Sequence, residues 1–70
     1  MKRKYFITML AWPFTGTDYF AGWESDTDPD VAMVRCRAVE YADMDEADED
    51  LARLSELGYE AEINTFYQVM

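Results

Sequence analysis

The chain has 70 residues, 50% of them hydrophobic and 16% aromatic, with 15 acidic and six basic side chains and a formal net charge of −9. This length allows one domain, and the apolar content excludes a disordered acidic tail. A surface of this charge repels nucleic acid and anionic membranes and attracts basic proteins. We therefore expect residues 1–70 to form a single acidic domain that binds neither nucleic acid nor a membrane directly.

Most residue types used in catalytic and metal sites are scarce or missing. The chain contains no histidine, so a serine, threonine or cysteine nucleophile lacks its usual activating base. Cys36 is the single cysteine, which excludes an internal disulfide and a multi-cysteine zinc site. Because Cys36 lies in an apolar stretch, we predict that it is buried and structural. The expected protein is not an enzyme and has no metal site and no cofactor.

The first 14 residues, MKRKYFITMLAWPF, begin like a signal peptide, with basic residues before an apolar stretch. Trp12 and Pro13 cut that stretch short, and no segment reaches the roughly 18 apolar residues that a membrane span requires. Residues 5–12 are instead predicted to form a first strand, followed by a turn with Pro and Gly and a returning strand at 19–24. Gly22 in the second strand indicates a bulge or a close approach of the backbone.

Residues 31–42, VAMVRCRAVEYA, allow two interpretations. Asp28 as an N-cap, Pro29 at the first helical position and apolar residues at 31, 34, 38 and 41 favour a helix over 29–42. Alternating small or apolar residues and arginines favour a strand. We favour a strand that ends near Tyr41, because the residues after it have the pattern of a new helix start.

A helix is predicted over residues 44–57. Asp43 is a good N-cap, and Glu46 three residues later completes a pair typical of a capping box. Gly58 is a natural residue for the C-terminal stop. The apolar residues within this segment recur every three or four positions, which is the spacing of a helix with one buried side: Met44, Ala47, Leu51, Leu54 and Leu57.

Residues 59–69 alternate between apolar and polar side chains and are predicted to form a closing strand. The element order is then β-β-β-α-β, which indicates an α+β fold. In it, a small antiparallel or mixed sheet of three to four strands is covered by one helix. The helix contributes its apolar stripe to the core, and the sheet contributes a second apolar set: Tyr5, Phe6, Ile7, Met9, Leu10, Val34 and Ile63.

The stretch DMDEADED places six carboxylates between Asp43 and Asp50. A helix rises about 12 Å over these positions, which gives roughly one negative charge per 2 Å, compared with about one per 1.7 Å in duplex DNA. Capping explains Asp43 and Glu46. It does not explain the acidic residues of the second turn, where the benefit of the helix dipole is lost: Asp48, Glu49 and Asp50.

A second acidic stretch, ESDTDPD, carries a carboxylate at every other position. In an extended segment these four side chains would share one side. Trp12 and Trp23 are candidate aromatic anchors for a protein partner. The predicted partner-binding residues are therefore Asp45, Glu46, Asp48, Glu49, Asp50, Glu24, Asp26, Asp28, Asp30, Trp12 and Trp23.

In size, acidity, its two acidic stretches and the lack of catalytic residues, the chain resembles the small anti-CRISPR and DNA-mimic inhibitor proteins of phages and mobile elements. The resemblance implies a non-enzymatic inhibitor, and we expect it to be a monomer or weak homodimer in the cytoplasm of a bacterial host. It would block the basic surface of a nucleic-acid-binding host protein, such as a CRISPR effector subunit. The alternative is a structural or accessory interaction domain that uses an aromatic surface, with the acidic face serving solubility only.

Overall fold

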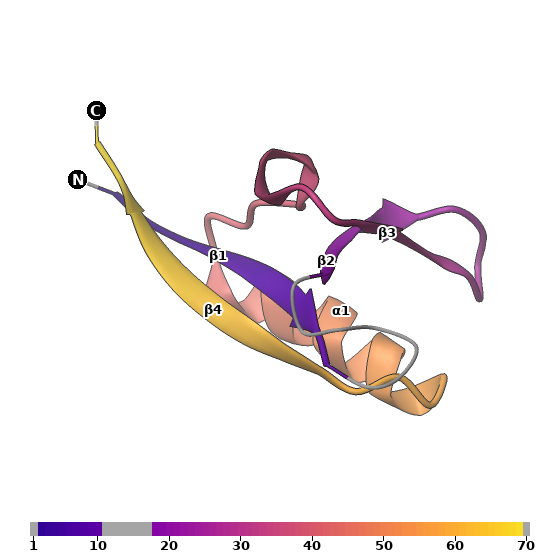
Figure 1. Ribbon diagram of the computed structural model, residues 1–70. Helices are drawn as coiled ribbons and strands as arrows, with labels where there is room; N and C mark the ends of the chain where they lie inside the picture. Colours follow the sequence, from indigo (N-terminus) through magenta and orange to yellow (C-terminus); the bar gives the residue numbers. More distant parts are fainter. Residues whose placement is uncertain (1, 11–17, 70) are drawn as a thin grey trace.

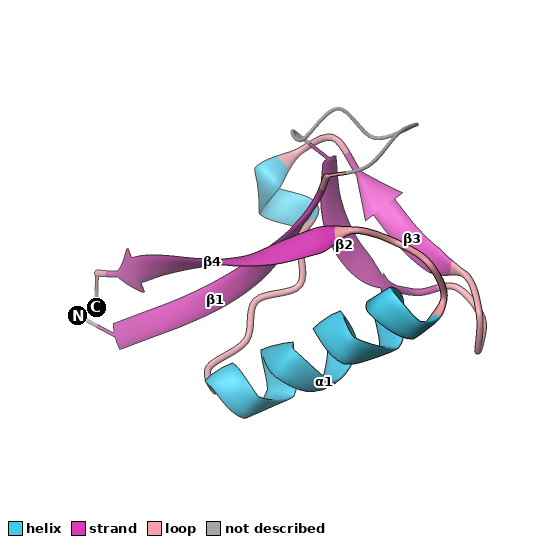
Figure 2. Cartoon of the chain, turned by 90° about the horizontal axis from the view of Figure 1, so that it is seen from below, coloured by secondary structure: helices cyan, strands magenta, loops and turns pink. Residues whose placement is uncertain are grey.

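A four-stranded antiparallel sheet and one α-helix dominate the computed structural model, which describes residues 2–10 and 18–69. The elements in chain order are β1 (Lys2–Met9), β2 (Asp18–Trp23), β3 (Pro29–Ala32), the 3-10 helix η1 (Arg35–Arg37), α1 (Met44–Glu56) and β4 (Ala61–Gln68). The strand order is β3-β2-β1-β4, with α1 on one face of the sheet and η1 on the other (Figures 1 and 2). The predicted α+β class is confirmed.

The longest ladder joins the first and last strands. β1 pairs with β4 over its whole length, from Lys2 opposite Gln68 to Met9 opposite Ala61. Within the described residues, β2 pairs with β1 at Thr8 and Met9 only, and the β2–β3 hairpin then diverges from the β1–β4 pair (Figure 1). The segment that leads into α1 takes over as the neighbour of β1.

Tyr5 and Tyr41 make that replacement contact. Their backbone N–H and C=O groups exchange two hydrogen bonds, at N–O distances of 2.9 and 2.8 Å. The start of the helical segment is therefore tied to the middle of β1, which fixes where α1 begins on the sheet.

The core lies between α1 and the sheet. Ile7 and Met9 point from β1 toward the helix and are fully buried, as is Leu54 on the facing side of α1. Burying side chains of this size stabilises a fold by about 1.5–3 kcal/mol each. Phe20, Tyr41 and Ala47 complete the buried cluster.

The opposite face of the sheet carries a cluster of aromatic rings that includes Phe6, which was predicted to lie in the core. The Phe6 ring is 5.8 Å from the Tyr19 ring and 5.9 Å from the Phe66 ring. The Arg35 guanidinium from η1 lies over it, 3.8 Å from the Phe6 centroid. Successive strand residues alternate between faces, so Phe6 cannot join Ile7 against the helix.

Other members of the predicted core are at the surface. Leu10 and Val34 are exposed, because they lie just outside β1 and just before η1. Met44 and Leu57, at the two ends of the helical segment, are 40% and 38% exposed. The predicted apolar stripe of the helix is thus correct in its middle and wrong at its ends.

Both predicted ends of the helix are confirmed to within one residue. The Asp43 carboxylate accepts a hydrogen bond from the Asp45 N–H at 3.0 Å, which satisfies one free donor of the first turn. At the other end, Gly58 has φ +93°, and its N–H donates to the Ser55 carbonyl at 3.0 Å. The Tyr59 N–H donates to the Leu54 carbonyl at 3.0 Å, which completes a Schellman motif.

We expect Gly58→Ala to lower the free energy of unfolding by about 1–2 kcal/mol, because an alanine Cβ is strained at this positive φ. No atom lies within 4 Å of the added Cβ, so the cost comes from the backbone and not from a clash. Urea denaturation measures the change, with the exposed neighbour Glu60→Ala as the control. An unchanged midpoint for Gly58→Ala would contradict the proposed cap.

Residues 31–42 form neither the predicted strand up to Tyr41 nor the alternative helix over 29–42. β3 ends at Ala32, and the chain turns into η1 before returning to β1. The last described pair of the β2–β3 ladder joins Ala32 to Tyr19. Gly22 has φ +119° beside a shift in the β2–β3 register, which confirms the predicted bulge.

Cys36 is exposed on η1, so the prediction of a buried structural cysteine is wrong. Its alternation with the arginines at 35 and 37 is the pattern of a strand, but in a 3-10 helix the same three residues project in different directions. Arg35 takes the position over the sheet, and the thiol faces away from the core.

Candidate acidic binding surface

The side of α1 that faces away from the sheet is acidic. Ala47 and Leu54 turn toward the core, and the opposite side carries Asp45, Glu49 and Glu56, which follow one another at spacings of four and seven residues. Glu46 and Asp48 flank this line and are also exposed. We call these five exposed carboxylates the acidic ridge: Asp45, Glu46, Asp48, Glu49 and Glu56.

The charge spacing of the acidic ridge is similar to that of one nucleic-acid strand. Its ends are 11 residues apart on a straight helix, or about 16 Å, which gives roughly one carboxylate per 3 Å. Phosphates follow each other at about 3.4 Å along the axis of one strand of duplex DNA. Glu56 was not in the predicted set, although its helical spacing from Asp45 and Glu49 places it on the same side.

Asp50 points inward and does not belong to the acidic ridge. Its carboxylate accepts hydrogen bonds from the Trp23 indole N–H at 3.1 Å and from the Tyr41 hydroxyl at 2.5 Å. Burial raises the pKa of Tyr41, and the hydrogen bond to Asp50 and the charge of that carboxylate raise it further. Asp50 was predicted to bind a partner, and the structure instead places it as a link between β2, the segment before α1 and α1 itself.

Trp23 is half-buried, and its ring is held by contacts within the protein. Besides the bond to Asp50, its ring lies 5.1 Å from the Phe20 ring in an edge-on arrangement, and the Arg53 guanidinium lies 4.0 Å from its centroid. These contacts account for the indole without an external partner. Trp12, the other predicted anchor, lies outside the described residues.

The second acidic stretch is a tight turn and not an extended segment. The N–H groups of Glu24 and Ser25 donate to the Asp28 carbonyl at 2.8 and 3.2 Å, and the Ser25 hydroxyl donates to the Asp28 carboxylate at 3.1 Å. The expectation that all four alternate carboxylates share one side is therefore wrong. Asp30 lies apart from the turn, half-buried in β3 opposite Gly22.

Arg53 brings this turn beside α1. Its guanidinium donates to the backbone carbonyl of Asp26, while its plane covers Trp23. The exposed acids of the turn, Glu24, Asp26 and Asp28, are thereby held next to the helix that carries the acidic ridge. The structure thus unites the two acidic stretches through the contacts of one arginine.

The remaining basic side chains lie elsewhere. Arg35 stands over Phe6 on the opposite face of the sheet, with its guanidinium 3.6 Å from the Glu40 carboxylate. Lys2, Arg3 and Lys4 open β1, at the end of the molecule where both termini lie (Figure 1). The charges are therefore separated, with the acidic ridge on one side and most of the cations away from it.

Across residues 2–10 and 18–69, no three side chains of His, Cys, Asp or Glu come together as a possible metal-ion site. The same residues contain no helix long and apolar enough to span a membrane. Comparisons with protein-family models, with curated proteins and with solved structures give no match.

Proposed function

We propose that the protein is a non-enzymatic inhibitor that presents the acidic ridge in place of a nucleic-acid backbone. It would occupy a surface lined with Lys and Arg on a nucleic-acid-binding host protein. The observation that carries the proposal is the charge density of the acidic ridge, whose five exposed carboxylates average roughly one per 3 Å of helix axis, close to the spacing of phosphates along one strand.

The physical basis is the pairing of carboxylates with guanidinium groups. Arginine binds carboxylate and phosphate with the same two-pronged geometry, so a surface built for phosphates also accepts suitably spaced carboxylates. Glu24, Asp26 and Asp28 extend the negative field from the ridge onto the adjoining turn. An elongated acidic surface of this kind also speeds the encounter with a basic groove.

The finer proposal is that the host protein is a subunit of a CRISPR effector complex and that the inhibitor acts in the cytoplasm of a bacterial host. Its support is the resemblance in size and acidity to phage and mobile-element inhibitors. The inhibitor would prevent target DNA from reaching the basic groove. It would not touch DNA itself, because its own net charge is −9.

We expect binding to the purified DNA-recognition module of such a complex to weaken at least about tenfold between roughly 50 and 200 mM salt, because the contacts are ionic. Surface-immobilised binding at several salt concentrations measures this effect. A short duplex DNA that contains the recognition sequence should compete with the protein. Binding that is independent of salt, or a complex that holds the protein and the DNA together, would contradict the proposal.

A further inference from the structure

The outer edge of β4 is a long strand edge that no described residue covers. β4 is last in the strand order and runs for eight residues. In β1, Tyr5 lies between Tyr41 on one side and Thr65 of β4 on the other. The backbone N–H and C=O of Tyr5 bond to Tyr41, so they are not bonded to Thr65. The N–H and C=O of Thr65 therefore point away from β1, toward the open edge of β4. The residues at the same alternation likewise offer free N–H and C=O groups: Ala61, Ile63 and Tyr67.

This edge lacks the features that usually prevent pairing with another chain. Glu62 is the one charged residue in β4, which contains neither proline nor glycine. The other end of the sheet is different, since β3 is only four residues long and begins with Pro29 and Asp30. Of the two sheet edges, only β4 is suited to extend the sheet.

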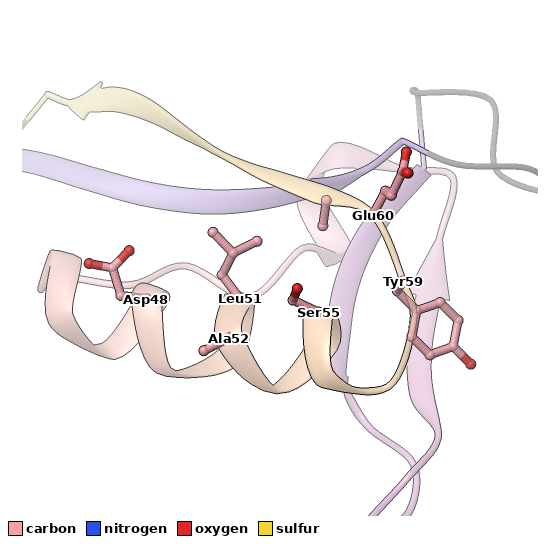
Figure 3. A pocket seen from close by; sticks show the side chains of 7 residues that line it. Asp48, Leu51, Ala52, Ser55, Tyr59 and Glu60 are labelled. Atoms are coloured by element: carbon pink, nitrogen blue, oxygen red, sulfur yellow. The ribbon is translucent and has the colours of Figure 1, made fainter.

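An open hollow lies beside the first residues of this edge, between α1 and β4 (Figure 3). Its volume is about 490 Å³. Asp48, Leu51, Ala52 and Ser55 line it from the helix, and Tyr59, Glu60 and Ala61 line it from the end of the turn and the first residue of β4, so that it has an apolar floor and an acidic side chain from each element. The short side chains of Ala52 and Ser55 leave room for apolar groups that enter along the edge.

The far end of the same strand carries exposed apolar side chains, one of which, the Tyr67 ring, has the Arg3 guanidinium 5.9 Å from its centroid. Tyr67 is 58% exposed and Val69 is 79% exposed. Tyr67 shares the face of Ala61 and Ile63, which is the face covered by α1, because alternate strand residues point the same way. Val69, two residues further on, continues that row.

We propose that two copies of the chain pair their β4 edges in antiparallel fashion about a twofold axis at Thr65, and that each copy inserts Tyr67 and Val69 into the hollow of the other. With this register, Val69 of one copy lies opposite Ala61 of its partner, and Tyr67 lies opposite Ile63. The whole length from Ala61 to Val69 is used, and the two sheets become one continuous sheet.

The distribution of charge favours a second copy of the chain as the partner at this edge. In the antiparallel arrangement Gln68 faces Glu62 of the other copy, and Lys2, the β1 partner of Gln68, lies one strand further along the same row, so the basic start of β1 comes near an acidic residue of the second copy. The two Glu62 side chains are kept apart, since each faces Gln68. A chain of net charge −9 can thus associate with itself along the part of its surface where the opposite charges meet.

Sedimentation velocity over about 1 μM to 1 mM tests the pairing. The wild-type chain should shift to twice its mass of 8.2 kDa as concentration rises. Thr65→Pro removes a free N–H at the axis without breaking the β1 ladder and should raise the dimer dissociation constant at least about tenfold, while Thr65→Ala should change it little. A monomeric wild-type chain at the highest concentration would overturn the proposal.

A second pair of variants separates loss of pairing from loss of folding. Val69→Asp changes a side chain that is 79% exposed, so the fold should persist while the dissociation constant rises at least about tenfold. Val34→Asp makes the same change near η1 and should have no effect on association. If Val69→Asp is folded and dimerises like the wild type, the β4 edge is not the interface, whatever the result for Thr65→Pro.

Discussion

Neutralising three carboxylates of the acidic ridge should lower the affinity for a basic nucleic-acid-binding partner by about 10²-fold. The variant is Asp45→Asn, Glu49→Gln and Glu56→Gln, which removes the line of charges along the outer side of α1. An exposed ion pair contributes up to about 1 kcal/mol, and three lost pairs therefore correspond to roughly 3 kcal/mol. Binding to the DNA-recognition module at low salt, compared with the wild type, measures the loss.

The matched control removes the same number of charges elsewhere. Glu40→Gln, Glu60→Gln and Glu62→Gln also changes the net charge by three, at exposed positions outside the acidic ridge. If net charge alone attracts the partner, both triple variants should weaken binding equally. If the spacing on α1 matters, only the first should reach 10²-fold. Both should keep a denaturation midpoint close to that of the wild type, because none of these six side chains is buried and the ion pair of Glu40 with Arg35 is solvent-exposed.

Equal affinity of the first variant and the wild type would reject the acidic ridge as the binding surface. The exposed turn would then be the next acidic group to neutralise: Glu24, Asp26 and Asp28.

The helix could be predicted from the sequence because its determinants are local. The cap at Asp43, the apolar spacing and the stop at Gly58 act within one short segment. Residues 31–42 were predicted wrongly because their conformation depends on distant residues. The described β2–β3 pairing ends at Ala32 with Tyr19, and Tyr41 returns to pair with Tyr5. An alternating pattern shows that a strand is possible but not how long its partner is.

The acidic surface was only partly predictable for a related reason. A run of carboxylates looks uniform in sequence, but helical spacing divides it. Asp50 lies three residues after Ala47 and four before Leu54, and so turns toward the buried side. This signal was available from the sequence, as was the position of Glu56 on the outer side. The donors that hold Asp50 come from β2 and from the segment before α1, and their arrival depends on the tertiary fold.

Asp50→Ala should destabilise the fold by about 2–4 kcal/mol, in contrast to its exposed neighbours in the same acidic run. The substitution leaves the Tyr41 hydroxyl and the Trp23 indole N–H without their acceptor, and each half-buried or buried donor left unpaired costs about 1–3 kcal/mol. A domain of this size is stabilised by only about 3–5 kcal/mol in total, so much of the variant should be unfolded at moderate temperature. Urea and thermal denaturation, followed by tryptophan fluorescence, measure the loss.

Asp48→Ala is the control. It removes the same carboxylate two positions earlier in the helix, where the side chain is exposed, and should change the free energy of unfolding by less than about 0.5 kcal/mol. Tyr41→Phe should give part of the Asp50→Ala effect.

The raised pKa of Tyr41 means that the native state holds the phenolic proton more tightly than the unfolded chain does, where the tyrosine pKa is 10.0. This stabilisation is complete below pH 10 and decreases as the pH rises beyond it. Equal stability of Asp50→Ala and Asp48→Ala would mean that Asp50 does not hold these elements together and belongs with the exposed carboxylates of α1.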